Sequence, residues 1–186
     1  MTADLAFRLG EDLEAAFPDV VAGYGQAVFT TALRMAGRAE DAADLAAETF
    51  LRAYVALRSY PPARRAELQL RPWLLTIVLN LVRNEARAAS RRPAQVAFDA
   101  WTCPNGRDGA PETPEDSAQR HDGQARLGAL LTRLPDGQRT AVVLRHVVGL
   151  PYAEVATVMG CPEGTAKSHV ARGLQRLRAS IPEEAP

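Results

Sequence analysis

The segment GLPYAEVATVMGCPEGTAKSHVARGLQRLR, residues 149–178, decides the fold of the C-terminal part of this 186-residue chain. It divides into a short helical pattern at 151–159, a break at Gly160-Cys161-Pro162 and a longer helical pattern at 163–179. A short helix, a tight turn with glycine and a longer helix form the sequence signature of a helix-turn-helix. Because proline suits the first position of a helix, Pro162 is expected to begin the second helix.

The second of these helices is predicted to have an apolar face and a basic face. Ala166, Val170 and Leu174 recur at helical spacing and are expected to pack inward. The other face presents cationic and hydroxyl groups, which can reach base edges and phosphates in a DNA major groove. The residues of this helix expected to contact DNA are Lys167, Ser168, His169, Ala171, Arg172, Arg176 and Arg178.

The net charge of zero conceals a segregation of charge along the chain. Residues 71–92 carry five basic and one acidic side chains, and residues 126–181 carry eight and three. Residues 93–125, between them, carry two basic and six acidic side chains. This pattern fits two nucleic-acid-contacting modules joined by a linker that repels the polyanion, although ordinary solvated surface charge explains it equally well.

The acidic stretch also predicts the domain boundary. Residues 93–125 are rich in proline and glycine and lack sustained apolar periodicity, so they are expected to form a flexible linker. Residues 1–92 are then an N-terminal helical domain, and residues 126–186 are a C-terminal helix-turn-helix domain. We expect the two to fold independently.

Helical periodicity accounts for the rest of the pattern, and no strand-like alternation occurs. The fold class is therefore all-α, with two small helical domains joined by a flexible acidic linker. Asp136 is expected to be a helix N-cap after the break at Leu134-Pro135. Before the linker, helices are predicted at 20–35, at 41–57 and from 72 onward, with a proline-bracketed loop at 59–70; after it, helices are predicted at 124–133 and 136–148.

The sequence offers no catalytic residues. The three histidines lie in different segments, and the phosphate-loop, dinucleotide-binding and nucleophile-elbow patterns do not occur. The two cysteines, Cys103 and Cys161, are too few for a disulfide framework or a four-ligand zinc site. We therefore expect no enzyme activity, metal or cofactor. No run is long enough for a membrane span, so a cytoplasmic protein without membrane insertion is expected.

Four segments together resemble one family. Segment 149–178 resembles the promoter-binding fourth domain of extracytoplasmic-function sigma factors, the small sigma-70-type initiation subunits of bacterial RNA polymerase. LTRLPDGQRTAVVLRHVVGL, residues 131–150, resembles the segment before it. EDAADLAAETFLRAYVAL, residues 40–57, resembles the polymerase-binding helix, and RPWLLTIVLNLVRNEARAASRR, residues 71–92, the helix that reads the minus-ten element.

The resemblance implies partners and roles. The partners are core RNA polymerase, promoter DNA and an anti-sigma factor, and the function is promoter-specific transcription initiation. The loop 59–70 corresponds to the one that captures an unstacked base, and the final helix to the one that reads the minus-thirty-five element. The residues implied to bind polymerase are Asp41, Asp44, Leu45, Glu48 and Phe50, and those implied to meet the minus-ten element are Asn80, Arg83, Asn84 and Arg87.

The chain departs from the family pattern at several positions. Ala47 stands where glutamine is usual, and Arg64 and Arg65 lie in a longer loop. His169 replaces a common arginine, and a histidine contact would be weaker and more sensitive to pH. Trp73 fits either the core or the melted DNA junction, and its apolar neighbours favour the core.

Two other functions share parts of this pattern. A stand-alone helix-turn-helix regulator would share residues 126–181, but would not need the segments 40–57 and 71–92. A DNA-acting enzyme such as a recombinase would need a nucleophile with clustered arginines, or metal-binding carboxylates, and the N-terminal domain has neither pattern.

Overall fold

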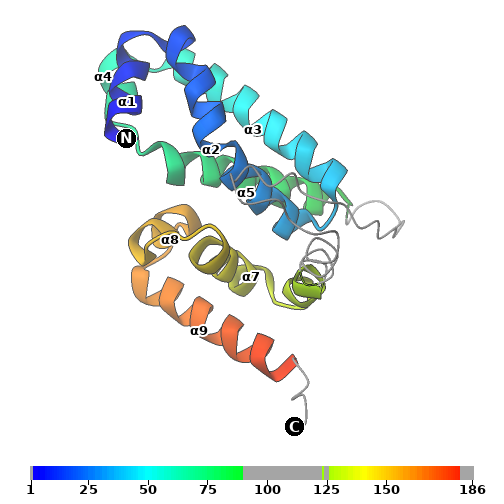
Figure 1. Ribbon diagram of the computed structural model, residues 1–186. Coiled ribbons are helices and arrows are strands. Elements are labelled where there is room, and N and C mark those ends of the chain that lie inside the picture. The colour runs from blue at the N-terminus through cyan, green and yellow to red at the C-terminus, as the bar shows by residue number, and fades with distance from the viewer. Residues whose placement is uncertain (1, 90–122, 124–125, 181–186) are drawn as a thin grey trace, which may run out of the picture.

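The N-terminal half is a bundle of helices (Figure 1). The structure is a computed structural model that describes residues 2–89, 123 and 126–180. The acidic segment 93–125 therefore lies almost wholly outside the described residues. The helices of this half are α1 (Thr2–Glu11), α2 (Leu13–Ala36), α3 (Ala39–Ser59), α4 (Pro62–Ala66) and α5 (Leu70–Ala89).

Local capping explains where α2 begins and ends. The Asp12 side chain accepts a hydrogen bond from the backbone N–H of Ala15 at 3.1 Å, so it supplies an N-cap that the apolar pattern beginning at Val20 does not reveal. At the other end, Gly37 adopts a φ of 85° and donates its N–H to the carbonyl of Leu33. The predicted end of this helix is thus confirmed, whereas its predicted start is too late.

The C-terminal half contains the helix-turn-helix. Residues 126–132 are helical, and Asp136 begins α7 without acting as its cap, since the N-cap is Pro135. Asp136 instead pairs with Arg139 at 2.7 Å. Pro162 precedes the last helix and does not begin it. The elements are α7 (Asp136–Val142), the π-helical turn η1 (Val143–Val147), α8 (Tyr152–Met159) and α9 (Glu163–Ser180).

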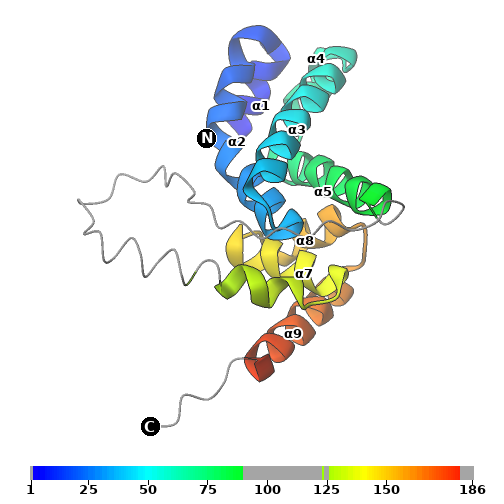
Figure 2. The same cartoon turned by 90° about the vertical axis from the view of Figure 1, so that its right-hand side faces the viewer.

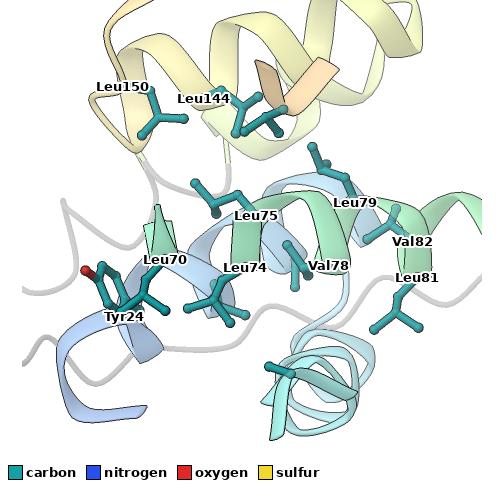
Figure 3. Packing of buried hydrophobic residues seen from close by; sticks show 14 of the residues in the cluster. Tyr24, Leu70, Leu74, Leu75, Val78, Leu79, Leu81, Val82, Leu144 and Leu150 are labelled. Atoms are coloured by element: carbon teal, nitrogen blue, oxygen red, sulfur yellow. The ribbon is translucent and has the colours of Figure 1, made fainter. Parts of the chain in front are cut away.

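One hydrophobic core runs through both halves. Leu74 and Val78, on one face of α5, are buried. Leu75 and Leu79 are buried as well, because they face Leu144 and Leu150 of the C-terminal half (Figure 3). Helix α5 therefore has two covered faces: it packs against α2 and α3 on one side and against α8 on the other. Independent folding of the two halves stays a prediction.

The all-helical fold class is confirmed, since the described residues contain no strand. Helix α9 lies on the far side of α7 and α8 from the N-terminal half (Figure 2). The outer face of α9 is therefore clear of the N-terminal bundle.

Candidate polymerase and promoter interfaces

The exposed side of α9 carries a shallow groove of about 220 Å³. The predicted inward face is confirmed, because Ala166 and Val170 are buried and Leu174 packs against the core. The six other residues expected to contact DNA, His169 excepted, are exposed on this helix. The groove itself is lined by Gly164, Thr165, Ser168, His169 and Arg172.

Lys167 is held in place by two neighbours. Its Nζ lies 2.6 Å from Oε1 of Glu163, one helical turn earlier. The same ammonium lies 5.6 Å from the centre of the Tyr152 ring, and the guanidinium of Arg145 lies 4.8 Å from that centre. Glu163 partly neutralises the charge of Lys167. Arg172 forms no ion pair with another described residue, so it contributes more positive potential to the groove than Lys167 does.

The ring of His169 packs inward against α7. A Cβ added at Gly137 would lie 3.1 Å from Cε1 of His169, so the glycine makes room for the imidazole. His169 is half-buried, and its buried Nδ1 has no hydrogen-bond partner among the described residues. His169 therefore lines the groove with only part of its ring and helps to seat α9 on α7.

Gly173 is a close-packing position between α9 and α7 that the apolar pattern did not reveal. A Cβ at this residue would lie 2.6 Å from Cγ2 of Val142 and 3.3 Å from the carbonyl oxygen of Gln138. The backbone of α9 at Gly173 therefore packs directly against the Val142 side chain of α7. The lack of a side chain at Gly173 determines how closely α9 packs on α7. The available signal was spacing, since Gly173 follows Val170 by three residues and therefore falls on the same buried face of the helix.

The polar end of α5 lies beside α3. Asn80, Arg83, Asn84 and Arg87 are all exposed, as a nucleic-acid contact requires. Arg83 also lines a cleft of about 350 Å³ with Asp41 of α3 and Asp136 of α7. The structure thus brings together one residue expected to meet the minus-ten element and one expected to bind polymerase.

Glu85 lines the same cleft and lies near the negative charges of Asp41 and Asp44. Partial burial raises the pKa of its carboxyl above the ordinary value of 4.5, and the charges of Asp41 and Asp44 raise it further. The carboxylate form of Glu85 is therefore less favourable in the folded protein than in the unfolded chain.

The outer face of α3 is acidic and apolar. Asp44 is exposed, and Glu48 pairs with Arg52 at 2.6 Å. Leu45 is 1% exposed and belongs to the core, where it packs α3 onto the bundle. Its expected part in binding polymerase stays a prediction. Phe50 is partly buried against the same core.

Two apolar side chains on α3 are exposed, which the sequence pattern did not predict. Leu51 and Val55 are 59% and 61% exposed and lie four residues apart, hence on one face. The buried side of α3 includes Thr49, Ala53 and Leu57, and Leu51 and Val55 fall outside that side.

The loop 59–70 is more ordered than expected, because α4 lies within it. The Arg64 guanidinium lies 3.9 Å from the centre of the Tyr60 ring, and that ring lies 6.3 Å from the ring of Trp73. Trp73 packs partly buried against the core, so the core interpretation is confirmed.

Comparison with known proteins decides the family. Residues 20–92 match sigma-70 region 2, and residues 124–177 match sigma-70 region 4. The chain is 31% identical over 181 residues to the RNA polymerase sigma-H factor of Pseudomonas aeruginosa, covering 95% of this chain and 92% of that one. It is 30% identical over 141 residues to the ECF RNA polymerase sigma-E factor of Escherichia coli, covering 74% and 72%. The chain belongs to the ECF group of the sigma-70 family.

The fold of this sigma factor also matches solved structures. The structure of CnrH in complex with the cytosolic domain of CnrY matches with a TM-score of 0.71 and 24% identity, over 99% of each chain. The sigma factor RpoE of Bartonella quintana, solved with the anti-sigma factor NepR, matches with a TM-score of 0.67 and 22% identity, over 91% of this chain and 98% of that one. Both likenesses concern the fold.

This sigma factor directs transcription initiation, and its family is not an enzyme class. Within residues 2–89 and 126–180, no group of three histidine, cysteine or acidic side chains could hold a metal ion. The described helices include none that is long and apolar enough to cross a membrane.

Proposed function

We propose that this sigma factor binds core RNA polymerase through the outer face of α3 and guides it to promoters through α5 and α9. The observation that carries the proposal is the separation of an acidic, apolar face on α3 from a cationic groove on α9, at opposite sides of the molecule. One face suits a basic protein surface, and the other suits DNA.

The polymerase contact follows from the chemistry of α3. Asp44 and Glu48 supply negative charge, and Leu51 and Val55 supply exposed apolar surface beside it. An interface with an apolar centre and a charged rim matches this composition. Asp41, at the edge of the cleft with Arg83, extends the acidic face toward the DNA-contacting end of α5.

The promoter contacts divide between two helices. The exposed residues Asn80, Arg83, Asn84 and Arg87 would meet the minus-ten element, and the groove on α9 would receive the minus-thirty-five element. The protein itself would perform no catalysis and would act in the cytoplasm. An anti-sigma factor is a further expected partner, since the solved Bartonella quintana relative is bound to one.

A charge reversal on α3 tests the polymerase contact. Replacing Asp44 and Glu48 with lysine should weaken binding to core RNA polymerase, because the acidic face then becomes basic. Binding of promoter duplex should not change. The matched control replaces Glu11 and Glu14, both exposed outside α3, with lysine. If the two double variants bound polymerase equally well, α3 would not be the docking helix, and loss of both activities would indicate a role in folding instead.

A further inference from the structure

Helix α1 packs against α4 at the end of the molecule remote from α9 (Figure 1). The match to sigma-70 region 2 begins at residue 20, so α1 lies outside it. The inner side of α1 is nevertheless well buried, with Leu9 fully enclosed and Ala6 nearly so. This helix is therefore an integral part of the bundle.

The contact between α1 and α4 is close enough to require a glycine. A Cβ at Gly10 would lie 3.1 Å from the Cβ of Ala66 and 3.1 Å from the carbonyl oxygen of Pro62. These two residues are the ends of α4, so Gly10 sets the distance of the whole short helix from α1. A larger residue would displace α4, because part of what it meets is backbone.

The other side of the loop is held by aromatic contacts. Arg64 of α4 packs on Tyr60, and the Tyr60 ring lies 6.3 Å from the ring of Trp73 in α5. A helix of five residues is unstable alone, so α4 takes its position from these neighbours. The loop between α3 and α5 therefore packs against α1 on one side and, through Arg64, against the rings of Tyr60 and Trp73 on the other.

We propose that α1 is a positioning element for recognition of the opened minus-ten strand, with Gly10 as the residue that sets the loop. This inference rests on the proposed function, in which the loop captures an unstacked base. Reading a base outside the duplex depends on a preformed site, so a displaced α4 should weaken that step selectively. The docking face of α3 and the groove of α9 do not include α1 or α4.

The test compares Gly10→Val with Gly23→Val. Both glycines lie in helices, but a Cβ at Gly23 would meet nothing within 4 Å. The wild-type holoenzyme first maps a promoter by run-off transcription. Each variant holoenzyme is then titrated with two probes from that promoter: the single non-template strand of the minus-ten region, and a duplex that holds only the minus-thirty-five region.

The expected result is a loss of about tenfold in affinity for the single strand with Gly10→Val, which corresponds to about 1.4 kcal/mol of binding free energy. Affinity for the duplex and for core polymerase should match those of Gly23→Val. Equal affinity of the two variants for the single strand would overturn the inference, and so would a parallel loss on both probes.

If circular dichroism shows that Gly10→Val is unfolded, Gly10→Ala is compared with Gly23→Ala in the same way. The expected loss of affinity for the single strand is then smaller. A wild-type protein that supports no initiation with core polymerase would overturn the proposed function itself. That failure is visible before any variant is tested, so it can be told apart from failure of the inference alone.

Discussion

The guanidinium of Arg71, in the first turn of α5, donates a hydrogen bond to the backbone carbonyl oxygen of Val148, directly after η1. This bond joins residues 77 positions apart and ties the N-terminal bundle to the helix-turn-helix half. Burial raises the pKa of the nearby Tyr24, an effect that the charge of Arg71 partly offsets and that of Glu154 reinforces. The junction therefore combines a charged hydrogen bond with the apolar contacts of α5 (Figure 3).

Removing the Arg71 side chain should destabilise the whole protein. Arg71→Ala should lower the free energy of unfolding by about 1.5–3 kcal/mol, the usual contribution of a hydrogen bond to a charged group. Arg52→Ala, which removes a well-exposed ion pair with Glu48, is the control and should cost about 0.2–1 kcal/mol. Urea titration followed by circular dichroism measures both. Equal losses would mean that the bond between the halves contributes little in solution.

Adding one methyl group at Gly173 should be costly. Gly173→Ala brings a Cβ to 2.6 Å from Val142, and overpacking of this kind costs about 1–3 kcal/mol. Gly164→Ala in the same helix meets nothing within 4 Å and should be neutral or slightly stabilising, because alanine favours helices. In thermal unfolding, the melting temperature of Gly173→Ala should therefore be lower than that of wild type, and that of Gly164→Ala should be equal to it or slightly higher. A Gly173→Ala protein as stable as wild type would show that α9 can shift on α7.

Two arginines of α9 should differ in what they contribute to DNA binding. Arg172 lines the groove, whereas Arg178 lies exposed further along the helix. Arg172→Ala should cost about 1–3 kcal/mol on the preferred duplex and much less on random duplex, as for a base contact. Arg178→Ala should weaken both duplexes alike and lower the salt slope by roughly 1, as for a phosphate contact. If Arg172→Ala weakened both duplexes equally in a salt titration, the reading face would be misplaced.

The raised pKa of Glu85 predicts that this residue destabilises the folded protein more at neutral pH than at acidic pH. The folded protein holds the Glu85 proton more tightly than the unfolded chain, so the contribution of this group to stability falls as pH rises from its ordinary pKa of 4.5 through the folded value. Glu85→Gln should therefore raise the melting temperature at pH 7, because it removes a carboxylate that is less favourable in the folded protein than in the unfolded chain. The gain should vanish below pH 4.5, where glutamic acid is protonated. A gain of the same size at both pH values would exclude charge as its cause.

Periodicity and turn chemistry predicted most of the helices and the buried faces. Val28 and Val170, for example, follow helical spacing and are both buried. No helix was predicted before residue 20, although Leu5, Ala6 and Leu9 of α1 follow helical spacing. Helix α4 was not predicted because its prolines indicated a loop. In α5, Leu75 and Leu79 gave no sign of their partner, since the contact with Leu144 is between segments far apart in the sequence.

The candidate sites were predictable in outline and not in detail. The charge pattern of α9 indicated its exposed face, but the pairing of Lys167 with Glu163 depends on which rotamers the folded helix adopts. Leu45 shares the polymerase-binding segment, yet its spacing with Thr49 places it in the core. The neighbouring helices determine which apolar face of α3 is covered, and a single sequence does not show which helices those are.

Run-off transcription with purified core RNA polymerase on a genomic DNA library tests whether this protein initiates transcription at defined promoters. Adding the protein should produce discrete transcripts whose start sites share two upstream sequence elements. Adding the variant with Asp44 and Glu48 replaced by lysine should produce far fewer transcripts from the same sites. Transcripts no different from those of core polymerase alone would contradict the assignment as an initiation factor.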